Sequence, residues 1–244
     1  MMIADIHAHL ELIRDLDDFI KRAKASGVKK IIANGTNKET NEKALYFSKK
    51  YDIVEAALGL YPSEVSKSNI NEEIKFIKMN KDKIVALGEV GLDKKEIKDE
   101  KEFEKQKEAF NEILKLGEEL NLPKIIHSRK AEEEVIEICR NHKKIIMHCF
   151  CGKKKLFLKG LEYGYYFSIP PIITRSKQFQ EWVKLAPLSR LLTETDSPFL
   201  SPYTDKPNES AFIVQTIKKI AEIKEMEEKE VENILFMNYQ KIFT

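Results

Sequence analysis

The sequence predicts an α/β fold, a (β/α)8 barrel with a parallel eight-stranded core and C-terminal helices. Three features lead to this prediction: eight short apolar runs typical of strands, a segment of helical periodicity after each run, and metal-binding side chains directly after several runs. Strict alternation of strands and helices implies parallel strands joined by right-handed crossovers. Eight such units fit an α/β barrel, whose strands all end at one pole.

The apolar runs place the strands at residues 3–6, 28–34, 53–58, 84–88, 123–126, 144–147, 164–169 and 190–194. Helical periodicity lies between them, for example through residues 16–23 and 103–120. Apolar positions within 212–223 and 231–235 predict two amphipathic helices that close the outer ring. The alternative, an open doubly wound sheet, usually has a glycine-rich phosphate loop after its first strand, where this chain has His7-Ala8-His9.

The chain has 244 residues without a linker, a low-complexity block or a change in composition, so we expect one domain over residues 1–244. Its 42 basic and 40 acidic side chains nearly cancel. Net charge therefore gives no general attraction for polyanions, and any affinity for nucleic acid must be local.

The N-terminus is polar and lacks a secretory signal, and the chain has three cysteines, an odd number. Both features favour a reducing compartment, so we expect the protein in the cytoplasm. No apolar run approaches the roughly 18 residues of a membrane helix. We therefore expect no membrane association, and no feature indicates an obligate protein partner.

Six side chains able to bind a metal stand at or near predicted strand ends: His7, His9, Glu89, His127, His148 and Asp196. Four of the five histidines are among them, whereas the fifth, His142, lies in a charged loop before a strand. Because the strands of a barrel end at one face, residues from the whole chain can meet there. Imidazoles together with carboxylates suit one or two borderline or hard divalent cations. The sequence therefore predicts a metal-dependent hydrolase.

Glu89 and Asp196 are the candidate catalytic residues. A carboxylate such as Glu89 can bridge two cations, which together can activate water and stabilise the attacking and leaving oxygens. Asp196 can both ligate an ion and accept a proton. Asp5 and Glu194 share strand parity with His7 and Asp196, so each either orients an imidazole or belongs to a structural polar layer beneath the site.

Five segments carry a family resemblance: Asp5-Ile6-His7-Ala8-His9, Gly88-Glu89-Val90-Gly91-Leu92-Asp93, Leu122-Pro123-Lys124-Ile125-Ile126-His127-Ser128-Arg129, His148-Cys149-Phe150 and Glu194-Thr195-Asp196-Ser197-Pro198. In this order, and spanning the chain almost end to end, they resemble the TatD family of metal-dependent deoxyribonucleases. The resemblance implies an α/β barrel and one or two divalent ions, commonly Mg²⁺, with Mn²⁺ or Zn²⁺ as alternatives. It also implies removal of nucleotides from a 3′ end, so the expected partner is a single-stranded or frayed DNA end.

The resemblance further implies how the donors divide between two ions. Position by position, one ion would be held by His7, His9, Glu89 and Asp196, and the other by Glu89, His127 and His148. Arg129 would face the substrate phosphate.

Two departures from the family pattern fall on residues that we assign to substrate binding. The histidine of the usual Gly-x-His-Pro is Tyr61 here, and tyrosine is a far weaker base near neutral pH. The usual Arg-Asn-Glu-Pro is replaced by a segment that keeps Asn208 but has proline in place of arginine. Lys206 would then have to supply the missing positive charge, with less directional hydrogen bonding.

The loops after the strands contain a local basic rim, formed by Arg129, Lys130, Lys153, Lys154, Lys155, Arg175, Lys177 and Lys206. Such residues contact DNA phosphates, although a solvated lysine-rich surface would look the same. Four aromatic residues either stack on bases or belong to the core: Tyr61, Phe150, Trp182 and Tyr203.

Three functions compete on these observations. The first is a phosphodiesterase acting on DNA ends. The second is a metal-dependent hydrolase of an amide or ester bond in a small molecule or an aminoacyl group, which the changes at Tyr61 and Pro207 keep open. The third is a non-catalytic, metal-stabilised binding protein, which the complete set of donors disfavours.

Overall fold

The computed structural model describes residues 1–97 and 99–244. Within these residues, eight strands form one parallel sheet in chain order, as predicted. The strands are β1 (Ile3–Ala8), β2 (Val28–Asn34), β3 (Val54–Leu58), β4 (Ala86–Asp93), β5 (Lys124–Arg129), β6 (Ile145–Met147), β7 (Tyr166–Ile169) and β8 (Leu191–Thr193).

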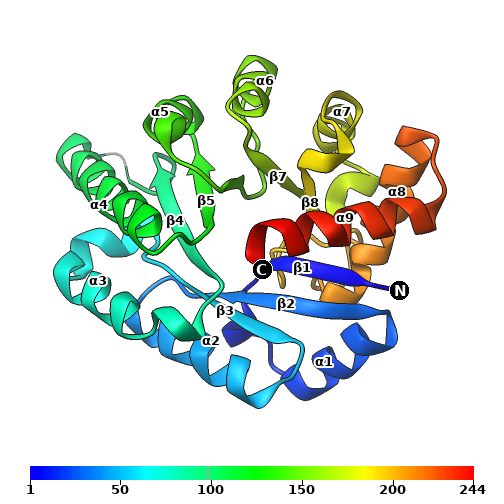
Figure 1. Ribbon diagram of the computed structural model, residues 1–244, viewed down its shortest axis with the longest axis horizontal. Coiled ribbons are helices and arrows are strands. Elements are labelled where there is room, and N and C mark those ends of the chain that lie inside the picture. Colours follow the sequence, from blue (N-terminus) through cyan, green and yellow to red (C-terminus); the bar gives the residue numbers. More distant parts are fainter. Residues whose placement is uncertain (98) are drawn as a thin grey trace.

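The helices surround the strands, and α1 to α8 follow one another around the ring (Figure 1). They are α1 (Leu16–Ala25), α2 (Lys38–Lys50), α3 (Ile70–Met79), α4 (Glu100–Glu119), α5 (Glu132–Ile138), α6 (Lys154–Glu162), α7 (Lys177–Leu185), α8 (Ile213–Lys224) and α9 (Glu228–Phe243). Their apolar faces are those that the periodicity indicated: α4, for example, buries Phe103, Phe110, Ile113, Leu114 and Gly117.

The barrel closes between β1 and the segment after β8. Ala8 bridges Ser197 in parallel, and the backbone N–H of Asp196 donates to the carbonyl of His7 at 2.8 Å. Asp5 strengthens this closure, because its carboxyl group accepts from the backbone N–H and hydroxyl of Thr195 at 2.9 and 2.6 Å. The segment that contains His7 and the segment that contains Asp196 are therefore held side by side.

Of the two alternatives for Asp5, the contacts agree with a structural polar layer and not with a partner of an imidazole ring. The register of β1 shifts between Asp5 and Ala8, and β1 ends before His9. Strand alternation therefore does not continue through the motif, and Asp5 faces Thr195 and Ser210 rather than an imidazole ring.

Strands β4 and β5 extend further than the predicted 84–88 and 123–126, and they pair along their extensions. Gly91 makes this pairing possible, because its φ of +148° and its close approach to β5 exclude a side chain. A Cβ atom at this position would lie 2.0 Å from the carbonyl oxygen of His127. The extension places Asp93 beside Arg129 in the register.

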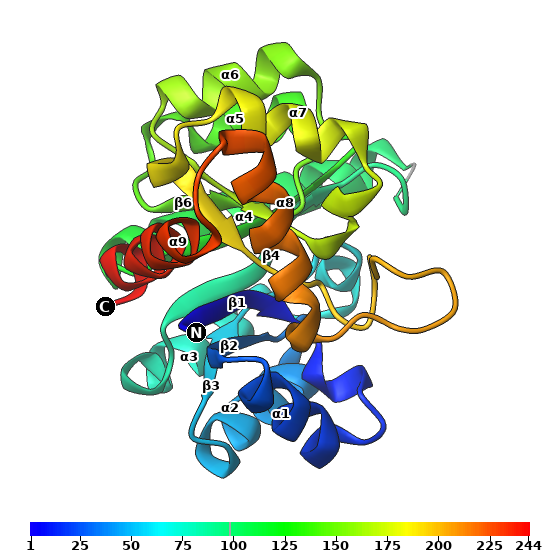
Figure 2. The same cartoon turned by 90° about the vertical axis from the view of Figure 1, so that its right-hand side faces the viewer.

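Helix α9 fills the pole of the barrel at which the strands begin. One buried side chain from each of β2 to β8, two from β1, and Tyr239, Ile242 and Phe243 of α9 form a single apolar cluster. Figure 2 shows α9 and both chain termini where β1 begins, with the loop after β8 extending at the opposite pole. The expectation that both C-terminal helices close the outer ring is therefore confirmed for α8 and wrong for α9.

None of the helices in residues 1–97 and 99–244 is long and apolar enough to cross a bilayer.

Replacing Asp5 with alanine tests the closure of the barrel. The change removes the acceptor of the buried Thr195 N–H and the buried Ser210 hydroxyl and one acceptor of the Thr195 hydroxyl, and an unsatisfied buried donor costs about 1–3 kcal/mol. We expect Asp5→Ala to lower the free energy of unfolding by about 3 kcal/mol or more. Urea denaturation followed by circular dichroism measures the change. The exposed Asp52→Ala is the control, and equal midpoints for the two variants would contradict the role of Asp5.

Candidate metal centre

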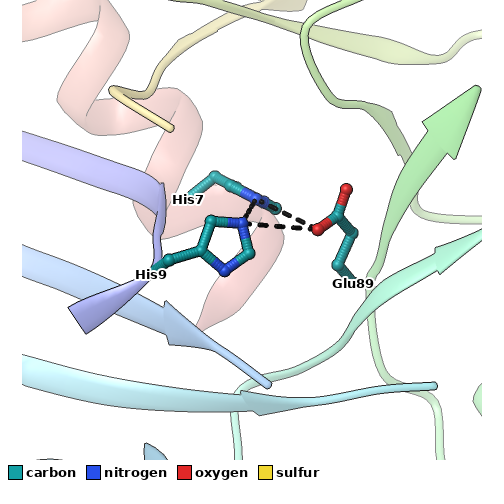
Figure 3. Close-up of side chains that lie close together, drawn as sticks. All are labelled: His7, His9 and Glu89. Carbon is teal, nitrogen blue, oxygen red and sulfur yellow. Dashed lines mark hydrogen bonds and ion pairs between the residues drawn. The ribbon is translucent and has the colours of Figure 1, made fainter. Parts of the chain in front are cut away.

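Four donor atoms meet at the pole where the strands end. The Nε2 atoms of His7 and His9 lie 3.2 Å apart, and they lie 3.6 and 3.4 Å from Oε2 of Glu89. Figure 3 shows the two imidazoles and this carboxylate pointing toward one another; His7 lies in β1, His9 directly after it, and Glu89 in β4. Oδ1 of Asp196 completes the group, at 3.5 Å from His7 Nε2 and 3.4 Å from His9 Nε2.

The spacing of this first group fits a divalent cation. An ion about 2.1 Å from each of four tetrahedral donors holds those donors about 3.4 Å apart. The five separations above run from 3.2 to 3.6 Å. Two neutral imidazole nitrogens and two carboxylate oxygens are also a donor set that borderline and hard divalent ions accept. His7, His9 and Glu89 therefore form a cluster that can hold a metal ion, and Asp196 lies at ligand spacing from both imidazoles.

A second group lies on the other side of the Glu89 carboxylate. Oε1 of Glu89 is 2.8 Å from Nδ1 of His127 and 3.7 Å from Nε2 of His148. These three residues again form a cluster that can hold a metal ion. Because Oε2 faces the first group and Oε1 the second, Glu89 stands between two sets of imidazoles.

Three of the four imidazoles have a carboxylate on their far side. Nδ1 of His148 lies 2.6 Å from Glu194, Nε2 of His127 lies 3.0 Å from Asp93, and Nδ1 of His9 lies 3.4 Å from Glu11. Such partners fix the orientation and tautomer of an imidazole and leave its other nitrogen facing the site.

The predicted role of Glu194 as an orienting partner agrees with this geometry, whereas sequence analysis missed Asp93 in the same role. The sequence did offer a clue to Asp93. It follows Glu89 by four residues, so in a strand that continues past residue 88 both side chains point to the same face. The imidazole of His7 is the exception to the pattern. Its buried Nδ1 has no hydrogen-bond partner among the described residues.

The charges of the cluster are tightly coupled. Burial would raise the pKa of Glu89, but the hydrogen bond with His127 and the neighbouring imidazoles of His7 and His9 hold it well below its usual range. Burial would lower the pKa of His148, but the charge and hydrogen bond of Glu194 outweigh burial and raise it to about 10. For His7, burial and the neighbouring His148 lower the pKa well below its ordinary value. Imidazolium protons thus balance the carboxylates, a task that a divalent cation can take over.

A cavity of about 980 Å³ opens above both groups, at the upper end of the roughly 300–1,000 Å³ typical of ligand pockets. Glu89, Asp196 and three of the four histidines of the cluster line it. Among its other described lining residues, the charged ones are equally divided: Lys43, Lys95, Arg129 and Lys130 against Glu11, Glu64, Glu96 and Glu132. The mouth of the cavity is therefore mixed in charge rather than a continuous basic rim.

Arg129 and Tyr61 lie in this cavity, in agreement with their predicted assignment to the substrate side. Arg129 is half exposed and lies 3.6 Å from Glu96. The hydroxyl of Tyr61 donates to Asp93 at 3.2 Å and lies 3.4 Å from Nε2 of His127. Burial and the charges of Glu89 and Asp93 raise the pKa of Tyr61, so this side chain stays a protonated donor.

Lys206 and Asn208 were predicted to bind substrate, and the structure places them elsewhere. Asn208 is buried, and its amide donates to the carbonyl of Thr195 at 2.7 Å, so it supports the loop before Asp196. The ammonium of Lys206 lies over the rings of Tyr203 and Phe212, 4.1 and 4.8 Å from their centroids. Neither residue is among the described residues that line the cavity.

Two of the four aromatic candidates belong to the core. Phe150 and Trp182 are buried, and the indole N–H of Trp182 donates to the carbonyl of Phe150 at 2.9 Å. Tyr203 packs edge-to-face on Phe212. Of the four, only Tyr61 lies among the described lining residues of the cavity.

The family model described as TatD related DNase matches residues 4–244. A Bacillus subtilis protein named uncharacterized metal-dependent hydrolase YabD is 36% identical over 255 residues, which cover 99% of each chain. Human deoxyribonuclease TATDN3 is 32% identical, over 99% of this chain and 94% of its own. The crystal structure of YJJV, a TatD homologue from Escherichia coli, matches with a TM-score of 0.90 at 26% identity, covering 99% of this chain and 97% of that one. The predicted resemblance is confirmed: the chain belongs to the TatD-related DNase family and is a metal-dependent hydrolase.

Proposed function

We propose that this protein is a divalent-metal-dependent deoxyribonuclease that removes nucleotides from the 3′ ends of single-stranded or frayed DNA. The observation that carries the proposal is the position of Glu89, whose two carboxylate oxygens face two separate groups of imidazoles. A carboxylate shared between two ions is the arrangement that phosphodiester hydrolysis by two metals requires.

In this proposal His7, His9, Glu89 and Asp196 hold one ion, and Glu89, His127 and His148 hold a second when both sites fill. The donor set suits Mg²⁺, Mn²⁺ or Zn²⁺. Ions bound there would polarise the scissile phosphate and make water a better nucleophile. Glu194, Asp93 and Glu11 keep three of the imidazoles in the orientation that these sites need.

Three residues around the donors have proposed roles toward the phosphodiester. Asp196, a member of the first group, also lines the cavity, where it can accept the proton of the attacking water. Arg129 stands at the cavity wall beyond the second group and would neutralise charge on the phosphate. Tyr61 donates to Asp93, so we assign it to positioning His127 rather than to proton abstraction.

DNA is the substrate that the family and the cavity together support best. The human relative is named a deoxyribonuclease, and the chain matches nearly the whole of it. The cavity is large enough for more than the reacting phosphate. Four basic side chains line the cavity, and they would bind the phosphates of a few nucleotides at a DNA end: Arg129, Lys130, Lys43 and Lys95.

The balanced charge of the mouth favours one alternative. Four acidic side chains around the entrance weaken the attraction for a polyanion, so an amide or ester in a small molecule or an aminoacyl group is the second candidate substrate. A panel of acyl compounds and oligonucleotides separates the two functions. Turnover confined to the acyl compounds would decide for the alternative.

Glu89→Gln tests the proposed function. The substitution keeps the shape of the side chain but removes the charge shared by both groups, so we expect loss of Mn²⁺ binding by calorimetry. We also expect cleavage of a 5′-labelled single-stranded oligonucleotide with Mg²⁺ or Mn²⁺ to fall at least 100-fold. The cleavage ladder should shorten one nucleotide at a time from the 3′ end.

The matched control is Glu73→Gln, since Glu73 is a buried glutamate on α3 that is not among the lining residues of the cavity. Its metal binding and cleavage should equal those of the wild type. The proposal fails if the wild type leaves the oligonucleotide intact with either ion, or if Glu89→Gln cleaves it at the wild-type rate.

Proton release on metal binding tests the coupling in the second group. The pKa of His148 is raised to about 10, so its imidazole is protonated at neutral pH, whereas an ion needs the neutral ring. Binding must therefore release a proton, and affinity should rise about tenfold per pH unit between pH 6 and 8 if one proton is displaced. Calorimetry of Mn²⁺ binding in buffers of different ionisation enthalpy counts the protons.

Glu194→Gln removes the charge that raises this pKa, so fewer protons should be released at pH 7. Glu118→Gln is the control, because Glu118 faces His142 at 3.5 Å, a histidine outside the donor cluster. Equal proton release from the wild type and Glu194→Gln would contradict the coupling.

A further inference from the structure

Two apolar side chains stand exposed at the edge of the cavity. Within residues 1–97 and 99–244, nine large apolar or aromatic side chains are exposed, and two of them, Leu12 and Phe199, line the cavity. Leu12 is 50% exposed and Phe199 is 52% exposed. An apolar surface left open beside a polar donor cluster indicates a place for an apolar part of a ligand.

Backbone hydrogen bonds join both residues to members of the first donor group. The N–H of Leu12 donates to the carbonyl of His9 at 3.1 Å, and the N–H of Phe199 donates to the carbonyl of Asp196 at 2.7 Å. The ring of Phe199 also stands edge-to-face to the imidazole of His9, with centroids 6.2 Å apart. The apolar edge therefore has a defined position next to the first group.

The turn that presents Phe199 is held in an uncommon backbone conformation. Asp196 and Leu200 both have positive φ, 57° and 55°, although neither is glycine. Asn208 supports this turn from below through its bond to the carbonyl of Thr195. Phe199 thus lies between two residues of left-handed backbone conformation, with its ring half exposed beside His9.

We propose that Phe199 and Leu12 form a base-binding shelf, on which the base of the 3′-terminal nucleotide stacks while its phosphate lies at the donor cluster. This inference rests on the proposed function and names the part of the substrate that the apolar edge binds. A nucleobase is the flat, apolar-faced group that lies next to a DNA phosphate, and every base has a face that can stack on an aromatic ring. The shelf therefore binds any of the four bases with little sequence preference.

The topology places the shelf and the cationic contacts on opposite sides of the cluster. The shelf lies after β1 and β8, which adjoin each other at the closure, whereas Arg129 ends β5, on the far side of the ring from β1. The backbone leading to the terminal phosphate would contact Arg129 and Lys130, and the terminal base would reach Phe199. A substrate end is thus held on both sides of the reacting bond.

The test compares two single-stranded oligonucleotides that differ only at the 3′-terminal residue, one with a normal base and one with an abasic residue. Each carries a phosphorothioate at the last linkage for binding by fluorescence anisotropy, and a normal linkage for cleavage. Stacking on an aromatic side chain contributes about tenfold or more in affinity, so the wild type should prefer the normal end by that factor. Phe199→Ala should bind both ends equally, and Phe199→Tyr should retain the preference.

Phe199→Leu keeps apolar volume but lacks a ring, so its preference should fall toward that of Phe199→Ala. The matched control is Tyr203→Ala, which removes a 38% exposed aromatic from the same loop, packed on Phe212 and not among the lining residues of the cavity. This control should behave as the wild type.

Binding tests the shelf and cleavage tests the proposed function, so the two can fail separately. Equal binding of the two ends by the wild type rejects the shelf, whether or not cleavage occurs. If the wild type cleaves both oligonucleotides and Phe199→Ala keeps the wild-type preference for the normal end in binding, the shelf is rejected and the nuclease function stands. A base preference in binding that depends on Phe199, without cleavage of either normal linkage, supports the shelf and rejects the nuclease function.

Discussion

The buried carboxylate of Glu89 is the group around which this pole of the barrel is arranged. An unpaired carboxylate away from water costs several kcal/mol, so a buried one needs positive charge or hydrogen bonds close by. In this chain four imidazoles provide that compensation, two at each carboxylate oxygen. The imidazoles that stabilise the buried carboxylate also form, together with it, two groups of donors spaced as the ligands of a metal ion are. Compensation of one buried charge and the capacity to bind cations are thus the same structural feature.

The donors reach Glu89 because the barrel closes correctly. His7 lies in the first strand, His9 directly follows it, and Asp196 follows the last strand, so the first group exists only where β1 and β8 meet. Asp5 and Asn208 hold the backbone at this closure without touching the donors' rings. The second group depends instead on β4 and β5, whose close pairing at Gly91 places His127 between Glu89 and Asp93. His148, directly after β6, joins this group because its backbone N–H donates to the carbonyl of Ile126 in β5 at 3.0 Å. The cluster therefore depends on the closure and on the pairing of β4, β5 and β6.

Much of this arrangement could be predicted from the sequence, for a physical reason. Strand periodicity locates the ends of strands, and in a parallel barrel all of those ends lie at one pole, so His7, His127, His148 and Asp196 could be brought together without coordinates. Asp93 was missed because the length of β4 depends on how closely β5 approaches, which apolar patterning does not record. Helix α9 was misplaced because periodicity shows which face is apolar but not which surface covers it. Lys206 and Asn208 were assigned by position in a motif, whereas their contacts are set by the fold of the loop after β8.

Anomalous scattering from crystals soaked in Mn²⁺ tests the central claim most directly. The account predicts a peak bound by Oε2 of Glu89 together with His7, His9 and Asp196. When the second site fills, it predicts another peak bound by Oε1 with His127 and His148. Peaks only at the surface, or an ion in the cavity that Glu89 does not ligate, would contradict it.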